Sequence, residues 1–173
     1  HAALTGHLVF STLHTNDALG AIPRLIDMKV QHFLIASAMN LVVAQRLIRR
    51  SCRACIEPVT IPDQVLHDII QELQKIPLQS LPADIDMNGT FQLKKGKGCQ
   101  QCEGLGYKGR IAIVEVVEVT DAFEQLIAAE KYNNNTLIVE ELQRQGFISM
   151  KQDGIMKALR GFTTLEEVWS ATE

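Results

Sequence analysis

The chain alternates short apolar runs with longer amphipathic segments. Leu8 to Leu13 is a continuous apolar run of the kind found in parallel strands that are buried on both faces. Leu41 to Ile48, rich in valine and leucine, predicts a strand or strand pair, and the alternation from Arg110 to Val119 predicts another. Apolar residues at helical spacing predict helices over 18–28, 33–39, 62–75, 121–130, 135–145, 149–159 and 164–170. The mixture predicts an α/β protein.

Several helix ends carry recognisable signals. Thr15 to Asp17 offers capping side chains for the first helix, and Pro23 falls in its first or second turn, where proline is tolerated best. Asp121 is the expected cap of the helix that follows it, and Gly146 is the expected end of the 135–145 helix. Thr164 to Glu167 has the spacing of a capping box. The stretch from 77 to 89 breaks the helical pattern.

Composition limits the possible classes. The 173 residues suffice for one ordinary domain or two small ones, and 46% are hydrophobic, enough to bury a core. The net charge of −3 gives no support to a specific nucleic-acid partner. The longest mostly apolar stretch, 33–44, is shorter than the roughly 20 residues that span a bilayer, and no secretory signal is visible. We therefore expect a cytoplasmic protein, and the start at His1 suggests a chain cut from something longer.

All four cysteines lie in two Cys-x-x-Cys pairs, Cys52 with Cys55 and Cys99 with Cys102. Four thiolates in two chelating pairs suit a structural Zn²⁺ with no open coordination position. Thioredoxin-like redox chemistry is the alternative, and it would need a single low-pKa pair at a helix start. Closing the 43-residue loop between the pairs costs a few kcal/mol, whereas structural zinc supplies on the order of 10 kcal/mol. We expect the metal to hold an inserted subdomain together.

Basic residues flank the cysteines. They form a solvated rim, or they face an anionic partner such as acidic lipid head groups or a nucleotide phosphate across a subunit interface. The residues are Arg46, Arg49, Arg50, Arg53, Lys94, Lys95, Lys97, Lys108 and Arg110.

Several motifs occur in the order known from one family. Thr5 to Asp17 is similar to a histidine box, and Ala44 to Arg49 follows it. Next come the two cysteine pairs, then Gly106 to Arg110, and then Asp153-Gly154 continuing through Gly161 to Val168. Over essentially its whole length the chain resembles the C-terminal part of the secretion-superfamily ATPases of the GspE/PilB type, which drive type II secretion or type IV pilus assembly.

The resemblance implies a fold and an activity. It implies the C-terminal part of a RecA-like P-loop ATPase core over 1–50, an inserted tetracysteine zinc subdomain over 51–109, and a return strand with an α-helical C-terminal bundle over 110–173. Such proteins work as hexamers with ATP and Mg²⁺, peripherally at the inner membrane against platform proteins of the secretion or pilus system. Their phosphate-binding loop and acidic box precede the histidine box and do not occur in these 173 residues. We expect the chain alone not to hydrolyse ATP.

The resemblance also implies candidate site residues. His14, at the carboxyl end of the first predicted strand, is placed to contact the γ-phosphate, and His7 is the weaker candidate. Thr12 and Thr15 are candidates for the nucleotide side, with a structural hydroxyl as the alternative. Arg46 is a candidate for phosphate or for an intramolecular ion pair.

A different class of function stays open. The chain is alternatively a free-standing zinc-stapled module that binds a partner protein without turnover. A reading frame that continues upstream through a strand and a Gly-x-x-x-x-Gly-Lys-Ser/Thr loop favours the enzyme; a frame that begins at His1 favours the module. The motifs do not separate secretion from pilus assembly.

Overall fold

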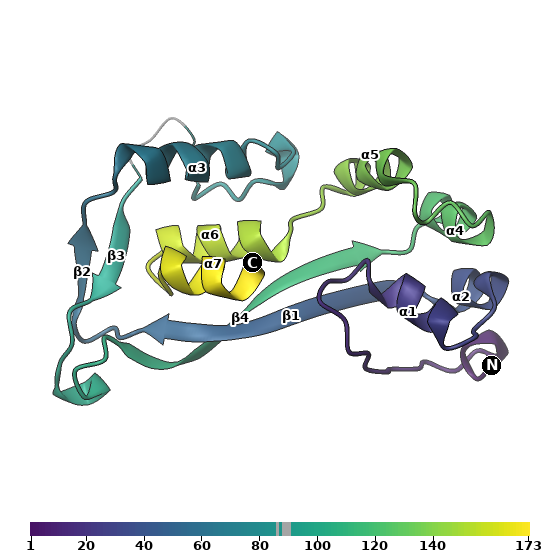
Figure 1. Cartoon of the computed structure of the whole chain (residues 1–173), viewed down its shortest axis with the longest axis horizontal. Helices are drawn as coiled ribbons and strands as arrows, with labels where there is room; N and C mark the ends of the chain where they lie inside the picture. The colour runs from purple at the N-terminus through teal and green to yellow at the C-terminus, as the bar shows by residue number, and fades with distance from the viewer. Residues whose placement is uncertain (86, 88–90) are drawn as a thin grey trace. The chain divides into compact units, whose positions relative to one another are not determined.

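The structure, a computed structural model, describes residues 1–85, 87 and 91–173 (Figure 1). In chain order its elements are η1 (Ala3–Thr5), α1 (Ala21–Asp27), α2 (His32–Ala38), β1 (Leu41–Ser51), β2 (Ile56–Val59), α3 (Asp63–Leu73), η2 (Leu78–Ser80), β3 (Leu93–Gly96), η3 (Gln100–Cys102), β4 (Tyr107–Glu118), α4 (Asp121–Ala128), α5 (Asn135–Gln145), α6 (Met150–Leu159) and α7 (Leu165–Thr172). In the described part of the chain, no helix has the length and apolar character that spanning a bilayer requires.

The chain divides into two compact units. Unit 1 comprises residues 1–44 and 115–147, and unit 2 comprises residues 45–114 and 148–173. Helices α4 and α5 therefore belong to unit 1, and α6 and α7 belong to unit 2. These divisions differ from the three segments expected from the sequence, which stay a prediction about the architecture of a longer protein.

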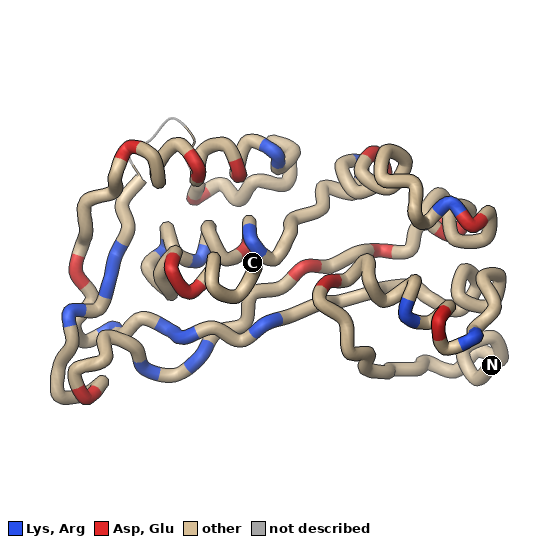
Figure 2. Tube along the Cα trace, viewed as in Figure 1, with Lys and Arg blue, Asp and Glu red and all other residues tan. Residues whose placement is uncertain are grey.

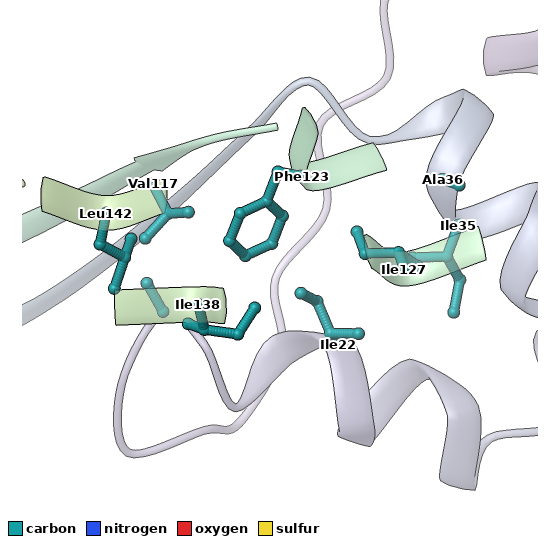
Figure 3. Packing of buried hydrophobic residues seen from close by; sticks show 9 residues of the cluster. Ile22, Ile35, Ala36, Val117, Phe123, Ile127, Ile138 and Leu142 are labelled. Carbon is teal, nitrogen blue, oxygen red and sulfur yellow. The ribbon is translucent and has the colours of Figure 1, made fainter. Parts of the chain in front are cut away.

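Unit 1 is built around Phe123, whose side chain is fully buried. Phe123 and Ile127 lie four residues apart on α4, so both side chains fall on the same face of that helix. That face packs against α2, and Figure 3 shows the surrounding apolar side chains. The buried members of this core are Ala18, Ile22, Ile35, Ala36, Val117, Phe123, Ile127, Ile138 and Leu142.

A polar network on α5 joins three parts of unit 1. The Glu141 carboxylate is 6% exposed and accepts hydrogen bonds from the Thr120 hydroxyl, the Arg144 guanidinium and the Gln145 amide. The Gln145 side chain also donates to the backbone carbonyl of Glu118 at the end of β4. Burial alone would raise the pKa of Glu141, but these donors lower it below its ordinary value.

We expect Glu141→Gln to reduce the acid sensitivity of unit 1. Because the folded-state pKa of Glu141 lies below its unfolded value, its carboxylate stabilises unit 1 fully at neutral pH, and this contribution fades as the pH falls through about 4.5 and then through the folded pKa. Thermal unfolding between pH 7 and pH 3 measures this pH dependence. Hydrogen bonds to a charged group such as this carboxylate contribute about 1.5–3 kcal/mol to stability at neutral pH. Exposed Glu140→Gln is the matched control; parallel stability curves for wild type and Glu141→Gln would contradict the assignment.

Unit 2 contains the antiparallel pair of β2 and β3, in which Ile56 lies opposite Gly96 and Val59 opposite Leu93. Helix α6 contacts β3, α3 and α7. The approach of α6 to α7 is close because Gly154 has no side chain: a Cβ there would lie 2.6 Å from Cγ1 of Val168. The Asp153-Gly154 motif therefore has a packing role between these helices.

Strands β1 and β4 form the other two-stranded sheet. Exposure alternates along β1, with Val43 and Leu47 exposed and Ile48 buried. In β4 the buried positions are Ile113, Glu115 and Val117, which alternate with more exposed neighbours. Both strands predicted from the valine-rich runs are thus confirmed, and each is longer than predicted.

The predicted strand over 8–13 is wrong for this structure. Residues 7–15 have no regular secondary structure, and Leu8 and Phe10 are 81% and 87% exposed. A buried parallel strand needs hydrogen-bonding neighbours on its edges. In the described part of the chain the strands pair as β1 with β4 and β2 with β3, and this segment has no partner strand among them.

The predicted helices are confirmed with shifts of a few residues at their ends. Gly146 ends α5 at a φ of 70°, and Pro23 lies in the first turn of α1, as expected. The cap of α4 is Thr120, not Asp121, because the Thr120 hydroxyl accepts from the backbone N–H of Phe123. The predicted break from 77 to 89 contains η2, and its residues 86, 88 and 89 lie outside the described residues.

The capping box predicted at Thr164 does not form. Thr164 makes no side-chain cap, and its hydroxyl lies 3.0 Å from the Tyr107 hydroxyl. The Thr164 hydroxyl makes this tertiary contact and does not accept a backbone N–H of the first turn of α7. A capping box is present instead at α6, where Ser149 and Gln152 satisfy each other's backbone N–H groups.

Candidate metal centre and nucleotide-side residues

The four cysteine sulfurs form one cluster in unit 2. All lie within 4.8 Å of one another, although 43 residues separate the two pairs along the chain. The Sγ atoms of Cys52 and Cys99 are 3.9 Å apart, those of Cys55 and Cys102 are 3.8 Å apart, and those of Cys99 and Cys102 are 3.7 Å apart. The two Cys-x-x-Cys motifs therefore meet in one cluster that could hold a metal ion, and their role as zinc ligands stays a prediction.

These separations fit a tetrahedral ion. Zinc–thiolate bonds of about 2.3 Å place the sulfurs of a tetrahedral site roughly 3.8 Å apart. Disulfide bonds would need about 2.05 Å, and all four cysteines are free thiols. Three of the four are buried, so the group has the soft ligands and the closed surroundings of a structural metal site.

Backbone N–H groups point at the sulfurs. Cys102 Sγ accepts from the backbone N–H of Cys99 at 3.2 Å and of Gly106 at 3.3 Å. Burial alone would raise the pKa of Cys102, but these donors and the neighbouring thiols lower it to about 6. At Cys55 burial dominates and raises the pKa to about 12. Of these two thiols, Cys102 is therefore the one whose surroundings favour the thiolate, the form that binds metal ions.

Glycines let the two arms of the second cysteine knuckle cross, and backbone hydrogen bonds from Cys52 to Gly106 at 2.9 Å and from Lys97 to Cys55 at 3.0 Å join that knuckle to the first pair. A Cβ at Gly96 would lie 2.1 Å from the carbonyl oxygen of Gly106, and a Cβ at Gly98 would lie 2.6 Å from that of Gly104. Gly98, Gly104 and Gly106 also have positive φ angles. Two backbones cross at van der Waals distance here, which only residues without side chains permit. A side chain at Gly96 or Gly98 would therefore force these two arms apart.

The turn between α6 and α7 contacts the chain where the cysteine module begins; we use this name for the segment 51–110, which carries both cysteine pairs. The backbone N–H of Ser51 donates to the carbonyl of Phe162 at 2.9 Å, and the Thr163 hydroxyl donates to the carbonyl of Arg49 at 2.8 Å. The carboxylate of Glu167 accepts from both the backbone and the guanidinium of Arg49. These contacts fix the end of β1 immediately before Cys52.

Part of the predicted basic rim is neutralised within unit 2. Arg49, Lys95 and Lys97 pair with Glu167, Glu166 and Glu57 respectively. The Arg49 guanidinium also lies 4.4 Å from the ring centroid of Tyr107. Figure 2 shows the basic residues along β3 and near the ends of β1 and β4 beside the cysteine module. Exposed basic residues of the same module are Arg53, Lys108 and Arg110.

The candidate nucleotide-side residues lie in both units. In unit 1, His7, Thr12 and His14 are exposed, and His7 Nδ1 lies 3.0 Å from the Thr5 hydroxyl. The Thr15 hydroxyl donates to the carbonyl of Asp17 at 2.9 Å. In unit 2, the Arg46 guanidinium donates to the carbonyl of Ala171 on α7. The catalytic and nucleotide-side roles of these residues stay predictions.

Sequence reasoning missed Glu115. Its side chain occupies a buried position of β4 and accepts the backbone N–H of Ala18. The signal was present: the β4 alternation places this acid on the same face as Ile113 and Val117. An ionisable residue at an inward position of a strand always needs a specific partner.

The comparisons with known proteins agree on one family. The family model described as "Type II/IV secretion system protein" matches residues 1–170. The type IV pilus assembly ATPase PilB of Thermus thermophilus is 44% identical over 171 residues, and that of Myxococcus xanthus is 41% identical over 173. The type II secretion system protein E of Aeromonas hydrophila is 39% identical over 171 residues.

These matches cover 99%, 96% and 99% of this chain, but 18%, 27% and 31% of the respective relatives. The chain therefore spans less than a third of the length of the relatives it matches. The family match extends over nearly the whole chain and includes both cysteine pairs. The chain belongs to the family of type II/IV secretion system proteins.

Proposed function

We propose that this chain is the C-terminal part of an ATP-hydrolysing motor for type II secretion or type IV pilus assembly, with a RecA-like core in the complete protein. The observation that carries the proposal is the match of residues 1–170 to the secretion family together with the four-sulfur cluster at tetrahedral spacing. Pilus and secretion relatives are similarly identical to the chain, so both systems remain within the proposal.

In this proposal Cys52, Cys55, Cys99 and Cys102 hold one structural Zn²⁺. The ion supplies folding free energy and, with four protein ligands, has no open position for substrate. Backbone N–H groups would stabilise the thiolate of Cys102, crossing glycines shape the second knuckle, and backbone hydrogen bonds from Cys52 to Gly106 and from Lys97 to Cys55 join the two pairs.

ATP and Mg²⁺ bind the complete protein in this proposal, chiefly through segments upstream of this chain. His14 contributes an imidazole N–H toward the γ-phosphate, with His7 as a weaker second candidate. The hydroxyls of Thr12 and Thr15 orient the nucleotide side, and the Arg46 guanidinium is available for phosphate charge.

The proposed surroundings follow from the family. The complete protein assembles into a hexamer in the cytoplasm and associates peripherally with platform proteins of the inner membrane. The exposed basic residues Arg53, Lys108 and Arg110 of the cysteine module suit an acidic surface, including acidic lipid head groups.

We expect His14→Ala in the complete protein to lower kcat for ATP hydrolysis about 10²-fold, because one lost donor to developing phosphate charge has an effect of this size. A steady-state phosphate-release assay measures the rate. His67→Ala is the matched control, since His67 is an exposed histidine on α3 paired with Gln71. An unchanged rate in His14→Ala would remove that residue from the mechanism, and a complete wild-type protein without hydrolysis would favour the interaction module.

A further inference from the structure

We propose that Glu115 is a positioning residue that holds the turn after His14 in place. The proposal rests on the proposed function, because it concerns the histidine-bearing segment of an ATPase. His14, Ala18 and Glu115 all lie in unit 1, which contains both the His14 segment and the end of β4.

The first observation is the burial of an acid on the inward face of β4. Glu115 is 7% exposed, and it shares one face of β4 with Ile113 and Val117, which are 0% and 1% exposed. A carboxylate at such a position loses its hydration and persists only with hydrogen-bond donors. An apolar residue would suit packing alone, so the acid has a specific task.

The second observation is a hydrogen bond that this carboxylate accepts. Oε1 of Glu115 accepts the backbone N–H of Ala18 at 2.7 Å in a buried hydrogen bond between residues 97 positions apart. Ala18 is itself 1% exposed. A charge-assisted bond to a backbone amide holds the main chain regardless of side-chain identity. Glu115 thereby fixes the chain four residues after His14.

The third observation is that the turn around Ala18 is locally ordered. The Thr15 hydroxyl donates to the carbonyl of Asp17 at 2.9 Å, and Asp17 Oδ1 accepts the backbone N–H of Gly20 at 2.7 Å. These short-range bonds shape the turn, and the Glu115 bond ties that shape to β4. Displacing Ala18 therefore displaces Thr15 and, through the adjacent peptide, His14.

The test uses the complete protein that contains this chain. We expect Glu115→Ala to lower kcat for ATP hydrolysis about tenfold with KM changed less than twofold, and to raise hydrogen exchange of peptides covering 15–20. Glu115→Gln keeps an acceptor oxygen and should recover at least half of the activity. Glu118→Ala, an exposed acid on the same strand, is the matched control and should match wild type.

A double mutant separates positioning from general damage. If Glu115 acts through His14, the Glu115→Ala change should add less than twofold in a His14→Ala background. Full additivity, or unchanged exchange of 15–20 in Glu115→Ala, would overturn the proposal. Raised hydrogen exchange of 15–20 in Glu115→Ala together with a wild-type kcat would also overturn the proposal. A complete protein without ATP hydrolysis would refute the proposed function and with it any catalytic role of Glu115, whereas the exchange measurement would still report whether the anchor exists.

Discussion

Replacing Cys99 with serine is expected to remove the metal from the chain and to unfold β2, α3 and β3. A serine hydroxyl is a poor zinc ligand, and structural zinc in four-cysteine sites contributes on the order of 10 kcal/mol to folding. Closing the loop between the two cysteine pairs costs only a few kcal/mol, so most of the stability of this region depends on the ion. Elemental analysis measures the metal, with one zinc per wild-type chain expected, and hydrogen exchange measures the unfolding.

The neighbouring exposed residue Arg53 provides the matched control. Arg53→Ser introduces the same residue type between Cys52 and Cys55 and leaves all four sulfurs in place. It should retain one zinc per chain and wild-type exchange. Two results would refute the stabilising role of the sulfur cluster. One is a Cys99→Ser chain that keeps its full metal content, and the other is native hydrogen exchange in α3 after the metal is lost.

Phe123→Ala is expected to destabilise unit 1 by about 3–5 kcal/mol, the cost of removing a fully buried aromatic ring and leaving a cavity. The ring lies among apolar side chains of α1, α2, α5 and β4, so all of these elements lose contacts together (Figure 3). Urea unfolding followed by hydrogen exchange of α2 and α4 peptides reports on this unit. The single tryptophan, Trp169, lies on α7 and reports on unit 2 through its fluorescence.

Phe33→Ala is the comparison for that experiment. Phe33 is 59% exposed on α2, and its truncation should change the free energy of unfolding by less than about 0.5 kcal/mol. Equal effects of the two substitutions would show that the core is not centred on Phe123. A loss seen only in the Trp169 signal would contradict the division into two units.

The sequence predicts best where the determining interactions are local or chelating. The helices from α3 to α7 follow from apolar spacing, and Gly146 ends α5 because a left-handed residue suits a helix end. The two cysteine pairs predict that they lie together, since each Cys-x-x-Cys pair supplies two of the four ligands that a tetrahedral ion needs. The helix predictions depend on neighbours in the sequence alone, whereas the meeting of the cysteine pairs follows from their shared chemistry although 43 residues separate them.

Prediction fails where a distant partner decides the outcome. The apolar run 8–13 is typical of a buried strand, but a strand forms only beside another strand, and this segment has none among the described residues. Thr164 has the composition of a helix cap, yet Tyr107 takes its hydroxyl. Glu115 accepts a hydrogen bond from the backbone of Ala18, and no local sequence pattern predicts that contact. Each miss is a tertiary contact overriding a local preference.

The contacts of Phe162 and Thr163 with β1 bear on the order in which the cysteine module folds. The hydrogen bonds from Ser51 to Phe162 and from Thr163 to Arg49 join positions more than 110 residues apart. Contacts of such long range form late, because the loop between them must close first. Because all four cysteines are synthesised before Phe162 and Thr163, we expect the thiols of a newly made chain to stay accessible to solvent and to competing ions until these contacts form.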